Sequence, residues 1–258
     1  MLTAVGRKAI APLVFLGEIV LIVFRSFLEL RGFFRPDFRP VARVLMKQIL
    51  FTGIHTWTVI VVLFFLIGTL IITQIIVFAG AESASMIGKV LIWVVVREVG
   101  PLLTAVIVIA RSGAAIAAEL ASMKFNDELW ALEVMGIPVA RYLVMPRIIG
   151  VAISVTMLAL YAEIMAINGG FLVGSLIWNI PFMEFQQGLI QLSTLNEIFL
   201  SLLKSFVFGL VIAAVCCHQG LSVEGGATQI PIAATNGVMR SLLLVFIIDA
   251  IVALVTFW

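Results

Sequence analysis

The chain has 258 residues, of which 63% are hydrophobic and 12% are charged, and its formal net charge is +2. A soluble domain carries about 25% charged residues, so the composition excludes a protein that hides its apolar side chains in one soluble core. The small net charge gives no argument for a nucleic-acid partner. At about 20 apolar residues per bilayer crossing, residues 1–258 are expected to form a single membrane domain with five or six spans.

An amphipathic helix is expected near the N-terminus, over residues 9–30. At 100° per residue, Arg7, Glu18, Arg25 and Glu29 project within about 40° of one another. A single polar stripe on an otherwise apolar helix is typical of a helix lying in the membrane interface. A first transmembrane span is the alternative interpretation.

A basic connector is expected after this helix. Its charges are Arg31, Arg35, Arg39, Arg43 and Lys47. Anionic headgroups on the cytoplasmic side attract such a segment. We therefore expect residues 1–48 to form an interfacial helix and connector, and residues 49–258 to form a five-span transmembrane bundle.

Five apolar segments are long enough to cross a bilayer. They cover residues 50–78, 87–118, 148–176, 198–217 and 240–257. The second contains Gly100 and Pro101, where we expect a kink or a partial re-entry. In the third, Gly170 and Gly174 form a small-x-x-x-small pair that would permit close contact with another helix.

The basic residues predict the orientation of these spans. Eight of the sixteen Lys and Arg residues precede Gln48, and the loop 119–147 carries Lys124, Arg141 and Arg147, whereas the loop 177–197 carries none. The positive-inside rule therefore places the N-terminus and the loop 119–147 in the cytoplasm. Five spans then leave the C-terminus outside.

A short cytoplasmic helix is expected within the loop 119–147, over residues 127–135. Asn126 can cap its N-terminus, and Gly136 followed by Pro138 can end it. The helix would display Trp130 among other apolar side chains, which is too much apolar surface for a solvated loop. Either the protein's own membrane ends or a groove on a partner should cover it. The predicted fold is an all-α membrane protein with an N-terminal interfacial helix, five transmembrane helices and this short coupling helix.

Charged residues within the spans require partners or water, because each costs about 2.5 to 3.5 kcal/mol on insertion scales. They are Arg97, Glu98, Glu163, Lys204 and Asp249. The similar depth of Lys204 and Asp249 favours an ion pair between their helices. Three roles remain open for the set: ion pairs that lock helices together, a polar route for a lipid headgroup, and a proton relay.

A candidate lipid-binding face lies at the outer end of the first span. Leu70, Gln74, Val77 and Phe78 recur at helical spacing on one side. This face is either ordinary helix packing or the wall of a cavity for acyl chains. In the second case Arg97 would meet the lipid phosphate, and Glu98 beside it would temper the attraction.

The sequence gives no argument for an enzyme. It contains no phosphate-binding loop motif and no H-E-x-x-H motif, and His55 and His218 are too isolated to build a metal site. Cys216 and Cys217 are adjacent in an apolar segment and suggest packing. The rival class is a proton-coupled secondary transporter or channel that would use Glu98, Glu163 and Asp249 as titrating groups.

Two long stretches resemble the MlaE-type permeases. Residues 96–147 read VREVGPLLTAVIVIARSGAAIAAELASMKFNDELWALEVMGIPVARYLVMPR, and residues 216–250 read CCHQGLSVEGGATQIPIAATNGVMRSLLLVFIIDA. The chain departs from the usual family wording at Gly136-Ile137-Pro138 and at Gln229-Ile230-Pro231. Both departures lie at expected cytoplasmic ends, so they affect details of ATPase docking.

The resemblance implies the inner-membrane permease of a phospholipid-trafficking ABC system in bacteria. Such a permease works as a homodimer with two nucleotide-binding ATPase subunits, periplasmic MCE-domain subunits and often a small STAS-domain protein. ATP and Mg would then lie on the ATPase, and this chain would carry no cofactor or metal. The residues expected to couple to the ATPase are Glu119, Asp127, Glu128, Trp130 and Glu133.

Overall fold

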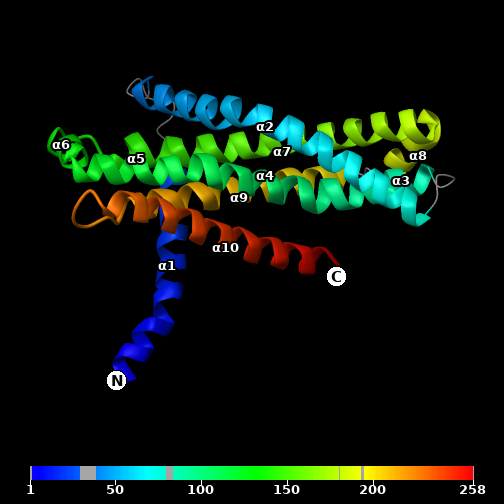
Figure 1. Cartoon of the computed structure of the whole chain (residues 1–258). Helices are drawn as coiled ribbons and strands as arrows, with labels where there is room; N and C mark the ends of the chain where they lie inside the picture. The colour runs from blue at the N-terminus through cyan, green and yellow to red at the C-terminus, as the bar shows by residue number, and fades with distance from the viewer. Residues whose placement is uncertain (1, 30–38, 80–83, 180, 193–194, 258) are drawn as a thin grey trace. The chain divides into compact units, whose positions relative to one another are not determined.

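The structure of the chain is a computed structural model that describes residues 2–29, 39–79, 84–179, 181–192 and 195–257 (Figure 1). These ranges contain helices and no strand. The α-helices are α1 (Leu2–Glu29), α2 (Arg39–Ala79), α3 (Ala84–Leu91), α4 (Gly100–Val108), α5 (Ala114–Phe125), α6 (Glu128–Val134), α7 (Met145–Trp178), α8 (Phe182–Leu192), α9 (Leu195–Leu221) and α10 (Gln229–Phe257). Three π-helical segments adjoin them: η3 (Ile92–Val99), η4 (Ile109–Gly113) and η5 (Ala140–Val144).

Among the described residues, five helical stretches are long and apolar enough to cross a membrane. They are Pro40–Phe78, Gly88–Phe125, Ala140–Trp178, Asn196–Leu221 and Gln229–Thr256. Each contains most of one expected span, and α1 precedes them as a separate helix. The prediction of an all-α membrane protein with an N-terminal helix and five spans is therefore confirmed.

The first span begins earlier than the apolar pattern indicated. Helix α2 starts at Arg39, so Arg43 and Lys47 lie on its first turns and not in a separate connector. Pro40 does not interrupt the helix, because a proline in the first turn removes no hydrogen bond that the helix would have made. Arg31 and Arg35 lie outside the described residues.

The expected re-entry at Gly100 and Pro101 is wrong, because Gly88–Phe125 is one continuous span. The helix accommodates the proline by changing to a π-helical turn, which is wider than an α-helical turn. The Gly100 N–H donates to the Val95 carbonyl oxygen, five residues earlier, which is the π-helical pattern of η3. Pro101 has no N–H to donate, so the hydrogen-bond ladder is shifted next to it and not broken.

The helices contribute to two compact units. Unit 1 comprises Met1–Ile49, Ile109–Val151 and Leu210–Leu244, and unit 2 comprises Leu50–Val108, Ala152–Gly209 and Val245–Trp258. Each has its own apolar core. Unit 1 buries Ile116, Ile148 and Ile212, and unit 2 buries Phe64, Ala162 and Phe208.

In unit 2, glycines let α2 and α7 approach closely. A Cβ atom at Gly68 would overlap the backbone of Ala166, and one at Gly169 would lie 2.6 Å from the Phe65 carbonyl oxygen. Gly170 of the expected pair also lies in this contact, since a Cβ there would be 2.9 Å from the Gly68 carbonyl oxygen. Gly174 is buried on the same helix. The close helix contact expected of α7 is thus present, and its partner is α2.

The loop expected over residues 177–197 contains a helix that the sequence reasoning did not identify. Helix α8 packs against α3, and the two lie side by side in Figure 1. A Cβ at Gly88 would lie 2.8 Å from the Phe185 carbonyl oxygen, and the Phe185 side chain is buried against the ring of Phe171. The end of unit 2 that carries α3 and α8 is therefore a packed helix pair.

Candidate functional site

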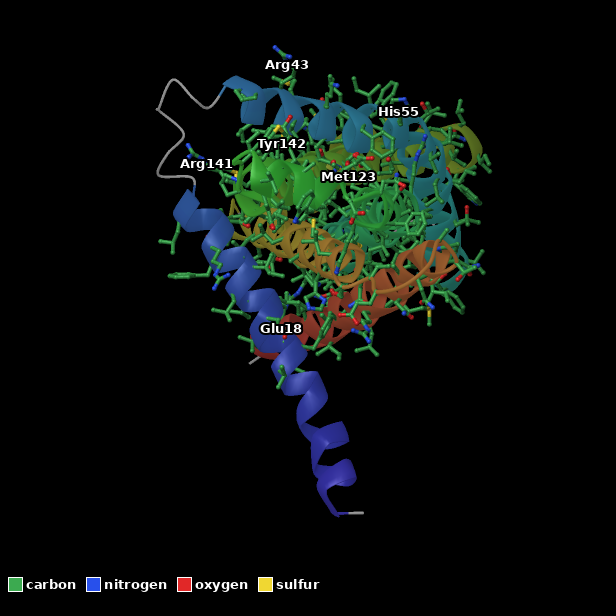
Figure 2. The ribbon with its side chains drawn as sticks, turned by 90° about the vertical axis from the view of Figure 1, so that its left-hand side faces the viewer. Glu18, Arg43, His55, Met123, Arg141 and Tyr142 are labelled. Carbon is green, nitrogen blue, oxygen red and sulfur yellow. The ribbon has the colours of Figure 1, made fainter. Side chains whose placement is uncertain are left out.

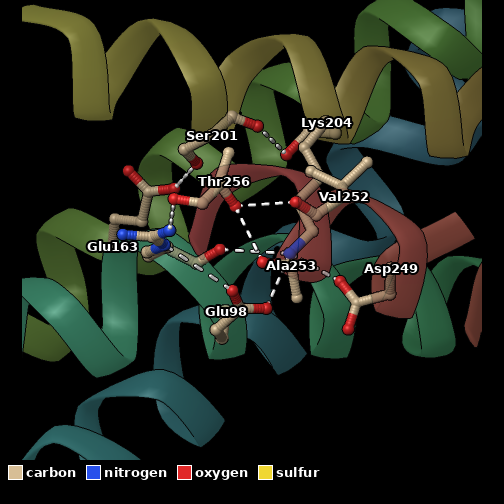
Figure 3. A network of polar contacts seen from close by, with 10 residues as sticks. Glu98, Glu163, Ser201, Lys204, Asp249, Val252, Ala253 and Thr256 are labelled. Carbon is tan, nitrogen blue, oxygen red and sulfur yellow. Dashed lines mark hydrogen bonds and ion pairs between the residues drawn. The ribbon is translucent and has the colours of Figure 1, made fainter. Parts of the chain in front are cut away.

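A network of charged side chains lies inside unit 2, with Lys204 at its centre (Figure 3). The Lys204 side chain is 4% exposed. Its Nζ lies 2.7 Å from Glu98 Oε2 and 2.6 Å from Asp249 Oδ1. The geometry is that of the expected Lys204–Asp249 ion pair, with Glu98 as a second carboxylate on the same ammonium group.

Lys204 also reaches the helix backbone next to Pro101. Its Nζ donates to the carbonyl oxygen of Arg97 at 3.2 Å. In an α-helix that oxygen would accept from the residue four positions later, which here is Pro101 and has no N–H. The Lys204 ammonium group therefore donates to the Arg97 carbonyl oxygen in place of the N–H that Pro101 lacks. It joins α9 to the disturbed part of the second span.

Arg97 extends the network toward α9 and α10. Its Nη2 donates to the Thr256 carbonyl oxygen at 2.9 Å, and its Nη1 lies 4.0 Å from Glu197 Oε1. Its Nε lies 3.9 Å from Glu98 Oε1. Arg97 is thus shared between two carboxylates and a backbone carbonyl. Sequence reasoning missed Glu197, because it lies at the start of α9 in what was expected to be a loop.

Glu163 has a different environment. Its side chain is buried and accepts a hydrogen bond from the Ser201 hydroxyl. A Cβ at Gly100 would lie 2.9 Å from Glu163 Cγ, so the absence of a side chain at position 100 makes room for this carboxyl group. Within the described ranges, no Lys, Arg or His forms an ion pair with Glu163.

The apolar face of α2 and the charge of Arg97 do not share a pocket. Leu70, Val77 and Phe78 are 62%, 70% and 87% exposed, and Gln74 is exposed beside them. A small cavity adjoins Arg97, and its walls come from η3, α9 and α10. None of the four α2 residues lines it. The two halves of the expected lipid site are therefore separate surfaces of unit 2.

The short helix expected in the loop 119–147 is present as α6. Asp127, with a φ of 58°, is its N-cap residue, and it makes no side-chain capping bond. The expectation that Asn126 caps the helix is wrong, because the Asn126 amide instead donates to Glu128 Oε1 at 3.5 Å. A left-handed residue before the helix turns the chain sharply after α5, so α6 starts in a new direction.

The C-terminal end of α6 has the expected glycine stop. Gly136 has a φ of +76°, its N–H donates to Glu133 at 2.9 Å, and the Ile137 N–H donates to Leu132 at 3.0 Å. This pair of backbone bonds is the Schellman motif. It holds a seven-residue helix on which Trp130 is 66% exposed and Glu128 and Glu133 are exposed. Three of the residues expected to couple to an ATPase, Glu128, Trp130 and Glu133, are thus exposed on α6.

Glu119 forms an ion pair within unit 1. Its Oε1 lies 2.8 Å from Arg147 Nη2, and the Arg147 side chain is 4% exposed. Glu119 itself is 59% exposed. The contact joins α5 to the start of α7. Since α6 lies between these two helices in the sequence, the ion pair holds together the two helices that α6 connects.

Comparison with known proteins identifies the family. The family described as Permease MlaE matches residues 45–255. A probable ABC transporter permease protein of Rickettsia typhi is 30% identical over 223 residues, which are 86% of this chain and 85% of that protein. A probable ABC transporter permease protein of Synechocystis is 34% identical over 171 residues, 66% of this chain and 64% of that protein. The chain belongs to the MlaE permease family.

Proposed function

We propose that the chain is the membrane-spanning permease subunit of an ATP-driven transporter that moves phospholipid between the bacterial inner membrane and a periplasmic MCE-type carrier. Family membership and the names of the relatives support a permease of the ABC class. The structural observation that carries the proposal is α6, a short helix that ends in a Schellman motif and exposes Trp130 and Glu133 between two spans.

ATP hydrolysis is assigned to a separate chain, which would hold ATP and Mg. The sequence offers no phosphate-binding loop. A short helix with an exposed aromatic residue and two glutamates suits the groove of a partner protein. We propose two such ATPase subunits, one for each copy of the permease in a homodimer, with MCE-domain subunits outside and a STAS-domain protein beside the ATPase.

Phospholipid as cargo is supported by the two kinds of surface in unit 2. The exposed face with Leu70, Val77 and Phe78 is apolar enough for acyl chains, and Arg97, whose side chain is 20% exposed, offers a guanidinium group for a lipid phosphate. These surfaces are separate in one chain, so a second copy would have to complete a shared lipid site. The basic residues support a cytoplasmic N-terminus and a periplasmic C-terminus.

The rival, a proton-coupled transporter, is less well supported by the same network. Glu98 and Asp249 both contact Lys204, which is the arrangement of a structural ion cluster. Glu163 is the candidate that would remain for a proton relay. The hypothesis of a proton-coupled transporter is therefore supported by one carboxyl group, that of Glu163. The hypothesis of an ABC permease is supported by the family match over residues 45–255.

The subunit composition provides a direct test. Native mass spectrometry of the complex extracted from its own membrane in mild detergent should show two copies of this chain with two ATPase chains and MCE-type chains. A chain that leaves the membrane alone, or with neither partner, would contradict the proposed assembly.

Replacing Trp130 with alanine should weaken ATPase binding about thirtyfold, because a central tryptophan in an interface contributes about 2 kcal/mol or more. The measurement is the affinity of purified ATPase for the permease in nanodiscs. Phe125→Ala is the matched control, since Phe125 is also an exposed aromatic residue, 45% exposed, but lies on α5. Equal affinities for the two variants would remove α6 from the ATPase interface.

A further inference from the structure

Unit 1 contains a cavity of about 530 Å³ beside α6. Helix α1 forms one wall with Ile22 and Arg25, and α6 forms another with Leu129 and Trp130. Segment η5 and the ends of α5 and α9 complete it. The volume lies within the range of about 300–1,000 Å³ that is usual for small-molecule sites.

The cavity wall carries two charges of each sign: Arg25, Lys124, Asp127 and Glu133. In the described part of the chain, no ion pair joins Arg25, Asp127 or Glu133 to another side chain. Lys124 Nζ donates to the Leu221 carbonyl oxygen at 2.6 Å and keeps two further hydrogens. The cavity is therefore lined by charged groups of both signs that form no ion pair with one another in the described residues.

Helix α1 is fastened in place where it forms this wall. Glu18, which is labelled on α1 in Figure 2, has its Oε2 2.8 Å from His218 Nε2 on α9. The Phe15 ring meets His218 edge-on at 5.2 Å between centroids. The Arg240 guanidinium lies 4.8 Å above the Phe15 ring. Because Glu18, Ile22 and Arg25 follow one another at helical spacing, these contacts fix the face of α1 that points into the cavity.

The lining selects among possible ligands. A simple anion would be opposed by Asp127 and Glu133, and a simple cation by Arg25 and Lys124. A purely apolar ligand would remove four charges from water with no compensation. A molecule with a phosphate, an ammonium group and an apolar body satisfies all three parts of the wall, because Ile22, Leu129 and Trp130 supply apolar contacts.

We propose that this cavity binds the headgroup of a zwitterionic phospholipid with a primary ammonium group, taken from the cytoplasmic leaflet. Arg25 and Lys124 hold the phosphate, and Asp127 and Glu133 accept hydrogen bonds from the ammonium group. The proposal relies on the cytoplasmic placement of α1 and α6 in the proposed function, but it does not require that this lipid is transported. The occupant touches Trp130 and Glu133, so it adjoins the surface proposed to meet the ATPase.

The test compares two positions on α1 that face different ways. A photo-crosslinking amino acid is placed at Ile22, which lines the cavity, or at Val20, which is 65% exposed and does not line it. The full-length protein is held in nanodiscs with equal amounts of phosphatidylethanolamine and phosphatidylglycerol. Adducts at Ile22 should favour phosphatidylethanolamine about tenfold, since a hydrogen bond to a charged group contributes about 1.5–3 kcal/mol. Val20 should show no preference.

Variants of Arg25 test the phosphate contact. Arg25→Gln should lower the yield of lipid adducts at Ile22 for both lipids, because both carry the phosphate, whereas Arg25→Lys should keep most of the yield. Arg43→Gln on α2 should leave the yield unchanged, because Arg43 does not line the cavity. Equal labelling at Ile22 and Val20, no lipid adduct at Ile22, or equal capture of both lipids would overturn the proposal. With the ATPase present, a peptide adduct in place of lipid would also overturn it. A failed transport assay would leave this result untouched, so the two proposals fail separately.

Discussion

Replacing Lys204 with methionine should lower the free energy of unfolding by about 3 kcal/mol, the lower end of the range for breaking a buried ion pair. It removes the buried cation and strands Asp249, which is 14% exposed, and Glu98, which is 36% exposed and better solvated. Lys204 contacts both Glu98 and Asp249 and also donates to the Arg97 carbonyl oxygen. The change therefore removes three contacts at once. Thermal or denaturant unfolding of the protein in detergent measures the loss, with Lys47→Met, at an exposed position on α2, as the control.

The ranking of the variants by loss of stability tests the cluster more strictly than the size of any single loss. Asp249→Leu should be less harmful than Lys204→Met, because Glu98 still pairs with Lys204 at 2.7 Å. Adding Asp249→Leu to Lys204→Met should recover part of the loss, since one of the two stranded carboxylates is then removed. Equal and additive losses for the two single changes would show that the cluster does not act as a unit.

Gly68→Ala should disrupt the contact of α2 with α7 and lower stability by about 1–3 kcal/mol or more. The new Cβ would overlap the backbone of Ala166, which cannot move aside like a flexible side chain. Gly17→Ala provides the control, because nothing lies within 4 Å of its added Cβ. At Gly17 the change should be neutral or stabilising, as alanine favours a helix over glycine by about 1 kcal/mol. Similar unfolding midpoints for the two variants would contradict the packing of α2 on α7.

Apolar length and charge were sufficient to predict the five spans, the N-terminal helix and α6. The spans are predictable because a bilayer crossing requires about 20 apolar residues in a row. The end of α6 is predictable because Gly136 and Pro138 are residues that terminate a helix. Helix α8 was also readable in part. Phe182, Phe185 and Leu189 recur at helical spacing, but the segment is too short to cross a bilayer, so apolar length alone predicts a loop there.

The neighbours of each helix could not be predicted from one sequence. Similar depth suggested Lys204 and Asp249, but the contact of Lys204 with Glu98 depends on the rotation of α9 against the second span. Likewise, Arg147 forms an ion pair with Glu119 because α7 packs near α5. The spacing of the two residues in the sequence does not predict this contact. The π-helical widening before Pro101 was missed for a local reason, since a proline in a span is compatible with a kink, a break or a shifted ladder.

Transport of phospholipid by the reconstituted complex tests the central claim most directly. Proteoliposomes containing the permease, its ATPase and its MCE partner should transfer labelled phospholipid to an acceptor only when ATP and Mg are supplied. An ionophore that collapses the proton gradient should leave the rate unchanged, and so should Glu163→Gln in a variant that remains folded. Transfer that proceeds without ATP, follows an imposed proton gradient and stops in Glu163→Gln would contradict the account and favour a proton-coupled transporter.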